Sequence, residues 1–192
     1  DGKYDIVGTI VGIVDSQKMI KGKENIVEGD EILALVSRGP HTNGYSLIRK
    51  LVKKYLENNP DKKLDANLQI GGMSVSDLIQ PHKSYYSEIK NMLAEGIDIH
   101  GLCHITGGGF QENIPRVLPD GLGVTLKVPI IEPFCTLQRI GNLSNDEMYR
   151  VFNCGYGMLV IVPPSMKEKI VKKYLGLGIG KVVALEKNSS RV

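Results

Sequence analysis

The sequence predicts an α+β fold in which helices pack on a mixed β-sheet. Short apolar runs rich in β-branched residues, typical of buried strands, recur along the chain. Amphipathic segments with apolar residues at helical spacing lie between them. The resulting order, β-β-α-α-β-α-β-α-α-β-α-β, is neither all-β nor a regular βαβ alternation, which favours a mixed sheet covered by helices.

Two buried strands and one long helix are predicted in the first third of the chain. Residues 6–14 and 31–37 are apolar and rich in β-branched side chains, so both are predicted strands. Residues 45–57 carry leucine, isoleucine and valine on one helical face and mainly lysine and arginine on the other. The run Asn58-Asn59-Pro60 ends this helix.

The remaining elements follow the same two patterns. Pro115 is expected to kink or delay the helix that contains it, and Ser144 is a plausible N-cap. Strands are predicted at 97–106, 122–128, 158–162 and 181–186, and helices at 74–79, 85–93, 110–118, 132–140, 146–152 and 167–175.

Composition excludes several classes of protein. The 192 residues are 42% hydrophobic and 23% charged, with a net charge of +3, as in an ordinary globular domain. That net charge is too small to indicate nucleic-acid binding. Aromatic residues are only 6% of the chain and include no Trp, so few side chains are available to stack on nucleic-acid bases. No apolar run is long enough for a membrane span, and the first residues carry no signal-peptide pattern.

The cysteines indicate a reducing compartment. Cys103, Cys135 and Cys154 are odd in number and have no paired spacing, so free thiols are expected. Together with the missing signal pattern, this favours a cytoplasmic location.

Two segments share one design, in which a buried strand runs through a glycine-rich turn into a helix. The first turn is 39–44, with His41, Thr42 and Asn43 as side-chain donors, and the second is 107–109, preceded by Thr106. Glycine lets the backbone approach an anion closely, and the following helix offers unpaired N–H groups. Neither turn matches a known phosphate-loop pattern, so each alone could be a simple turn. The pair favours a phosphate site.

Other chemistry has weaker support. His100 and His104 are four residues apart in a predicted strand and the sequence has no zinc motif, so no metal site is expected. No nucleophile elbow is present, and Cys154 has no basic partner in the sequence. His41 lies in a polar loop and is the histidine best placed for proton transfer, because a loop histidine can titrate near neutrality.

Three long motifs resemble the aminoimidazole ribonucleotide synthetase (cyclo-ligase) family. They span residues 37–50 (SRGPHTNGYSLIRK), 104–116 (HITGGGFQENIPR) and 147–158 (EMYRVFNCGYGM), and the opening 2–8 resembles the entry into the family's C-terminal domain. The match covers essentially the whole chain in order. It implies a single C-terminal domain over residues 1–192, without the N-terminal ATP-binding and dimerisation domain of the family.

The resemblance implies an ATP-dependent enzyme that closes the imidazole ring of formylglycinamidine ribonucleotide in purine biosynthesis. ATP and Mg²⁺ are the implied cofactors, both needing the N-terminal domain, so this chain alone is not expected to turn over. The full-length protein would be a homodimer without nucleic-acid or membrane partners. Within the motifs, His41 is the implied catalytic residue, and the implied substrate or phosphate contacts are Asn43, Gly44, Thr106, Gly107, Gly108, Gly109, Asn113, Asn153 and Gly155.

Two alternatives stay open at this point. The chain could be a nucleotide-binding module of a related enzyme, of the selenophosphate synthetase or thiamine monophosphate kinase type, or a non-catalytic interaction domain. Where many family members read Pro-Thr-Arg-Ile-Tyr, this chain reads Pro81-His82-Lys83-Ser84-Tyr85, which puts a nucleotide contact near 81–85 in doubt.

Overall fold

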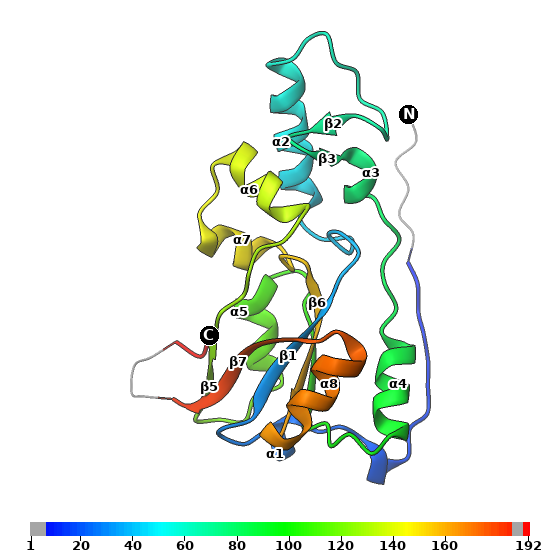
Figure 1. Cartoon of the computed structure of the whole chain (residues 1–192), viewed down its shortest axis with the longest axis vertical. Helices are drawn as coiled ribbons and strands as arrows, with labels where there is room; N and C mark the ends of the chain where they lie inside the picture. Colours follow the sequence, from blue (N-terminus) through cyan, green and yellow to red (C-terminus); the bar gives the residue numbers. More distant parts are fainter. Residues whose placement is uncertain (1–6, 186–189) are drawn as a thin grey trace.

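A computed structural model of the chain, which describes residues 7–185 and 190–192, contains a five-stranded antiparallel sheet with helices on both faces (Figure 1). The strand order is β4-β6-β1-β7-β5, and a separate two-stranded hairpin is formed by β2 and β3. The strands are β1 Glu31–Val36, β2 Gln69–Ile70, β3 Met73–Ser74, β4 Gly101–His104, β5 Leu122–Leu126, β6 Tyr156–Val162 and β7 Leu177–Ala184.

The helices are short apart from α2, which has 13 residues. In the part of the chain that the structure describes, three 3-10 turns lie between or beside them, at Ser16–Lys18, Ile114–Arg116 and Pro164–Met166. The α-helices are α1 Gly22–Asn25, α2 Tyr45–Glu57, α3 Val75–Leu78, α4 Tyr86–Ala94, α5 Gly109–Asn113, α6 Phe134–Gly141, α7 Asn145–Val151 and α8 Lys167–Tyr174.

The two central strands supply side chains to both faces of the sheet. In β1, Ile32 and Ala34 belong to one buried cluster and Leu33 and Leu35 to the other, because successive side chains of a strand point to opposite faces. The first cluster continues into α2, α5, α6 and α7, and the second is covered by α4 and α8. A central strand buried on both faces reads as a continuous apolar run, which is the pattern of residues 31–36.

The α+β prediction is confirmed, although each recorded pairing in the five-stranded sheet is antiparallel rather than mixed. The predicted helix 45–57 is α2 with the same bounds. Pro115 lies in the 3-10 turn that follows α5, as its missing N–H predicts, and the Ser144 side chain accepts a hydrogen bond from the Glu147 N–H at the start of α7.

The strand predicted at 6–14 is wrong for its described part. Residues 7–15 form no strand and run alone along the outside of the molecule (Figure 1). Ile10 and Ile13 are 97% and 103% exposed. The segment carries the β-branched residues typical of a strand, but no strand among the described residues pairs with it. Residue 6, the opening 2–6 and Glu186 of the last predicted strand lie outside the described residues.

The sheet topology brings three loop segments to one edge. Both β1 and β4 pair antiparallel with β6, one on each side, so β1 and β4 run parallel to each other. Their last residues, Val36 and His104, pair with Tyr156 and Met158 near the start of β6. The chain that leaves β1, the chain that leaves β4 and the chain that enters β6 therefore meet at the same edge.

Candidate functional site

The two glycine-rich loops contact each other at this sheet edge. The side-chain amide of Asn43 donates a hydrogen bond to the Thr106 hydroxyl over 3.2 Å. A Cβ on Gly107 would lie 3.4 Å from Asn43 Oδ1, which is ordinary van der Waals contact. We name residues 37–44 the first loop and residues 105–109 the second loop. Their contact is the geometry that one shared anion site requires.

The first loop is held in an unfavourable backbone conformation. His41 and Thr42 have φ angles of 51° and 71°, in the left-handed region that favours glycine. A β-branched residue such as Thr42 is a genuine outlier there, at a cost of about 1–2 kcal/mol. The loop ends at Gly44, with φ 75°, where a Cβ would lie 2.3 Å from the Phe152 ring. Such strain persists only where the surrounding structure enforces it, and it is typical of functional sites.

The second loop obtains its shape from glycine. Gly108 and Gly109 have φ angles of 87° and 59°, and a Cβ on Gly109 would lie 1.9 Å from the Tyr149 carbonyl oxygen. The buried Asn113 amide donates to the carbonyl oxygens of Thr106, Gly107 and Gly109 at 3.3, 3.2 and 2.7 Å. Asn113 therefore holds the loop from within, and its nitrogen is already occupied.

The third segment fastens the first loop to the sheet. Asn153 donates to the Gly39 carbonyl at 3.1 Å, and its oxygen accepts from the Ser37 hydroxyl at 3.2 Å and the Gly155 N–H at 2.9 Å. Gly155 has φ 105°, and a Cβ there would lie 2.1 Å from Ile131. Both residues are placed beside the loops, but their polar groups are used within the protein.

Accessible donors remain on the outer side of the two loops. Thr42, Ser46 and Gly107 are exposed, while Asn43 and Thr106 are half-buried. Within the described residues, the backbone N–H groups of Gly107 and Gly108 donate no hydrogen bond. Gly44, the N-cap of α2, has no side chain with which to cap it, so the first N–H groups of this helix also face outward with its positive dipole end.

His41 is buried, with 1% of its surface exposed. Its Nε2 accepts hydrogen bonds from the backbone N–H groups of Arg38 at 3.1 Å and Lys83 at 3.4 Å, so the proton of the neutral ring is on Nδ1. That Nδ1 is buried without a partner among the described residues. Desolvation, followed by the charges of His82, His104 and Lys83, lowers the pKa of His41 to about 4. His41 is thus neutral at pH 7, not titrating near neutrality as the sequence pattern suggested.

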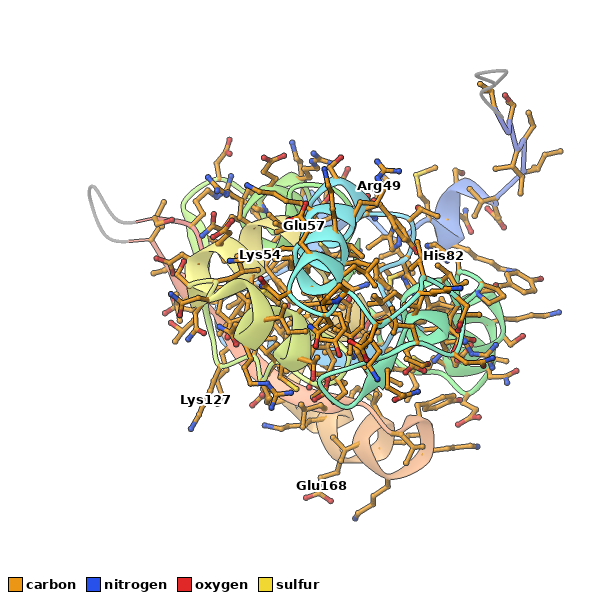
Figure 2. The ribbon with its side chains drawn as sticks, turned by 90° about the horizontal axis from the view of Figure 1, so that it is seen from above. Arg49, Lys54, Glu57, His82, Lys127 and Glu168 are labelled. Carbon is orange, nitrogen blue, oxygen red and sulfur yellow. The ribbon has the colours of Figure 1, made fainter. Side chains whose placement is uncertain are left out.

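Two further histidines surround His41. The His82 ring stacks on it, with centroids 4.0 Å apart, and the His104 ring lies 6.4 Å from His41 and 5.3 Å from His82. His82 and His104 are exposed, and desolvation lowers the pKa of His104. Figure 2 shows His82 on the flank from which the N-terminal segment leaves. Sequence reasoning missed this grouping because the three residues share no spacing, and only the β4-β6-β1 order brings them together.

Charged groups of both signs lie at the loops. Arg38 is exposed in the first loop, and the Lys83 ammonium donates to the Val36 carbonyl at 3.3 Å. The carboxylate of Glu112 lies against Gly108, where a Cβ would be 2.2 Å from its Oε2. Arg116 partly balances that charge, with 3.9 Å between the nearest nitrogen and oxygen of this exposed pair.

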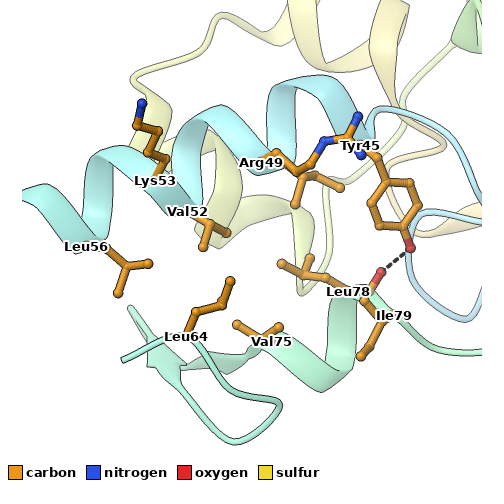
Figure 3. Close-up of a pocket in the computed structure, with 10 residues that line it drawn as sticks. Tyr45, Arg49, Val52, Lys53, Leu56, Leu64, Val75, Leu78 and Ile79 are labelled. Atoms are coloured by element: carbon orange, nitrogen blue, oxygen red, sulfur yellow. Dashed lines mark hydrogen bonds between the residues drawn. The ribbon is translucent and has the colours of Figure 1, made fainter. Parts of the chain in front are cut away.

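A separate cavity of about 420 Å³ lies between α2 and α3 and is almost entirely apolar (Figure 3). Val52, Leu56, Leu64 and Val75 line it, and the Tyr45 hydroxyl donates to the Leu78 carbonyl at its rim. It lacks the convergent polar groups that orient a charged substrate, so it is no candidate for the anion site.

The structure brings every predicted site residue to one sheet edge, in three roles. Gly107 and Gly108 present backbone N–H groups. Asn43 and Thr106 join the two loops, because the Asn43 amide donates to the His41 carbonyl at 3.0 Å and to the Thr106 hydroxyl at 3.2 Å. The remaining predicted residues shape or fasten the loops, and these are His41, Gly44, Gly109, Asn113, Asn153 and Gly155.

This combination of an α+β domain and paired loops places the chain in a known class. Residues 27–191 match the family described as "AIR synthase related protein, C-terminal domain", and the chain belongs to this family. The resemblance inferred from the three motifs is thereby confirmed.

Two curated relatives are similar over the whole chain. A protein of Magnetococcus marinus named phosphoribosylformylglycinamidine cyclo-ligase is 42% identical over 200 residues, which are 100% of this chain and 55% of that protein. The trifunctional purine biosynthetic protein adenosine-3 of Gallus gallus is 40% identical over 204 residues, or 19% of its length. The chain thus spans about half of the first relative and a smaller part of the second.

The helices give no sign of a membrane span. Within residues 7–185 and 190–192, none combines the length and the apolar character that crossing a bilayer requires.

Proposed function

We propose that the chain is the C-terminal part of an ATP-dependent cyclo-ligase that converts formylglycinamidine ribonucleotide to aminoimidazole ribonucleotide. One observation carries the proposal beyond family membership, namely the contact between the two loops through Asn43 and Thr106. The shared edge presents backbone N–H groups and a helix N-terminus, both of which suit phosphate.

The reaction needs positioning and charge stabilisation more than a strong nucleophile. ATP phosphorylates the formamide oxygen and ADP is released. An amidine nitrogen then attacks the activated carbon, and the transferred group leaves as phosphate. The backbone amides of Gly107 and Gly108 and the N-terminus of α2 would hold a phosphate and its developing charge, and Asn43 would keep the two loops together. The strained first loop would keep these donors fixed before the substrate arrives.

His41 keeps a role in this proposal, with a restriction from its surroundings. As a neutral ring it can donate from Nδ1, but it cannot serve as an imidazolium acid at pH 7. His82 stacks on the ring face and the Nδ1 edge faces Gly157 of β6, so substrate contacts His41 only after the segments around it rearrange.

The fit of the implied cofactors is uneven. The loop donors fit the phosphates of ATP. Mg²⁺ prefers carboxylate oxygens and phosphate, and Glu112 is the acid that lies directly against the second loop. A single exposed carboxylate does not make a resident magnesium site, so we assign Mg²⁺ to the nucleotide and to the acidic ligands of an N-terminal domain.

The partner domain would cover the segment before the first 3-10 turn. Ile10, Val11 and Ile13 are almost fully exposed β-branched residues in an extended segment, a pattern that suits pairing with another strand. We therefore propose that residues 1–192 form one C-terminal domain and that residues 7–14 pack on the N-terminal ATP-binding and dimerisation domain of the same enzyme, in the cytoplasm.

A chimera tests this function. The chain is fused to the N-terminal portion of the Magnetococcus marinus relative, and formation of aminoimidazole ribonucleotide is followed by chromatography. We expect ATP-dependent turnover, which Asn43→Ala lowers at least tenfold in kcat/KM because the hydrogen bonds that hold the two loops together are lost. Asn91→Ala, at an exposed position of α4, serves as the matched control. A chimera that folds and binds ATP without turnover, or an Asn43→Ala chimera of unchanged rate, would contradict the proposal.

A further inference from the structure

Three imidazoles meet beside the first loop. His41 comes from the chain after β1, His82 from the segment after α3, and His104 is the last residue of β4. One ring nitrogen of each lies within 4.8 Å of those of the other two. His41 is buried, whereas His82 and His104 are exposed, so an ion in solution can reach two of the rings directly.

The hydrogen bonds of two rings leave lone pairs suited to a metal. His82 Nδ1 lies 2.9 Å from the Lys83 carbonyl, so it carries the proton and leaves the Nε2 lone pair free. Metal-binding histidines commonly donate their other ring N–H to a carbonyl in this way. His41 has its lone pair on Nε2, directed at the backbone of Lys83, the residue next to His82.

We propose that His41, His82 and His104 bind one divalent transition-metal ion of the zinc class. Imidazole nitrogen suits Zn²⁺, Co²⁺ and Ni²⁺, whereas Mg²⁺ and Ca²⁺ prefer oxygen, so this site is distinct from the magnesium that accompanies ATP. Three protein ligands leave a fourth position for water, as in open zinc sites.

The geometry needs only side-chain adjustment. Zn–N bonds of about 2.0–2.1 Å place the nitrogens of a tetrahedral site about 3.3 Å apart, so the cluster must close by about 1 Å or more. His41 is fixed by its burial, and the exposed rings of His82 and His104 can rotate toward it. The ion would replace the two N–H contacts that His41 Nε2 now accepts, which limits the expected affinity to the micromolar range.

The electrostatic surroundings permit a cation. The ammonium of Lys83 is the adverse charge, and the Glu88 carboxylate 3.1 Å away offsets it. An open pocket of about 710 Å³ leaves room for the fourth ligand beside His82 and His104. It is lined by these two histidines but not by His41, together with Ile10, Lys83, Ser84, Tyr85 and Met158.

Metal titration of the whole chain without a polyhistidine tag tests the site. With Zn²⁺ by calorimetry and Co²⁺ by visible absorption, we expect one ion per chain, a Kd in the micromolar range and tetrahedral cobalt bands. His82→Ala and His104→Ala should each weaken binding at least thirtyfold. His100→Gln, which keeps a hydrogen-bond donor for Asp30, is the matched control and should leave it unchanged.

Three results would overturn the site. The first is a Kd above 1 mM for both Zn²⁺ and Co²⁺, and the second is unchanged binding in His82→Ala. The third is a cobalt–thiolate band in the unsubstituted chain together with loss of binding in Cys135→Ser, which would assign the ion to the half-buried thiol. Because metal binding is measured without turnover, failure of the site leaves the proposed function standing.

Discussion

The two loops follow strands that flank the same strand β6, yet they reach their shapes by different means. The first loop places His41 and Thr42 in the left-handed region and leads into the 13-residue helix α2. The second uses glycine at its left-handed positions and leads into α5, which has five residues. The first loop therefore stores backbone strain and ends at the N-terminus of the long helix α2. The second loop lets a ligand approach its backbone N–H groups closely. The same sequence of strand, glycine-rich turn and helix thus produces a strained loop in one place and a loop with accessible backbone amides in the other.

The largest expected effect is on the packing of the second loop. Gly109→Ala would put a Cβ 1.9 Å from the Tyr149 carbonyl oxygen, at a φ of 59°, so the backbone must shift. We expect a loss of about 4 kcal/mol or more in the free energy of unfolding, measured by urea denaturation. Gly121→Ala, with φ 79° and open space around its Cβ, is the control and should cost about 1 kcal/mol. Equal losses in the two variants would contradict the packing argument.

Two asparagines test whether each loop is held in place by its own side-chain amide. Asn113→Ala removes the donor to three carbonyls of the second loop, and Asn153→Ala removes bonds to Gly39, Ser37 and Gly155 around the first. We expect about 2–3 kcal/mol for each, because buried polar partners are left unpaired. Hydrogen exchange should localise the loosening to 105–109 in the first variant and 37–44 in the second. Faster hydrogen exchange in both loops of each variant would contradict the idea that each asparagine holds one loop.

The first loop should also make stability depend on pH. The pKa of His41 is about 4 in the folded chain and 6.5 when exposed, so the unfolded state binds the proton more readily. The contribution of His41 to the free energy of unfolding is fully present well above pH 6.5 and is lost as the pH falls toward 4. About 1.6 kcal/mol of it is lost between pH 6.5 and 5. Most of this slope should persist in His104→Gln. A flat free energy of unfolding over that range would mean that His41 is not desolvated.

The smallest effect concerns strain. Thr42→Gly relieves a left-handed β-branched residue, and the greater freedom of glycine in the unfolded chain offsets part of the gain. We expect a net stabilisation of about 0.5 kcal/mol. Gly107→Ala, whose Cβ meets only Asn43 Oδ1 at 3.4 Å, should be close to neutral in stability. Destabilisation by Thr42→Gly would show that the threonine conformation carries no strain.

Most elements could be predicted from the sequence because local signals specify them. The apolar face of α2 and its Asn-Asn-Pro ending fix that helix, and alternation between two buried clusters explains the continuous apolar run of β1. Residues 7–14 carry an equally strong strand pattern, but no partner strand lies beside them in the described chain, and pairing is not a local property.

The site was predictable only in part, for a related reason. Glycine-rich turns before helices revealed both loops, but their meeting depends on β1 and β4 flanking β6, which no local pattern contains. Asn113 and Asn153 looked like ligand contacts, and the structure uses their amides within the protein. The cluster of His41, His82 and His104 joins three separate segments and has no sequence signature.

The central claim is that the two loops form one anion site, and amide chemical shifts test it most directly. In a titration of the ¹⁵N-labelled chain with ribose 5-phosphate, the N–H signals of Gly107, Gly108 and Ser46 should move together with a single Kd, which Asn43→Ala raises. Signals that move with different Kd values, or that do not move at all, would contradict the claim.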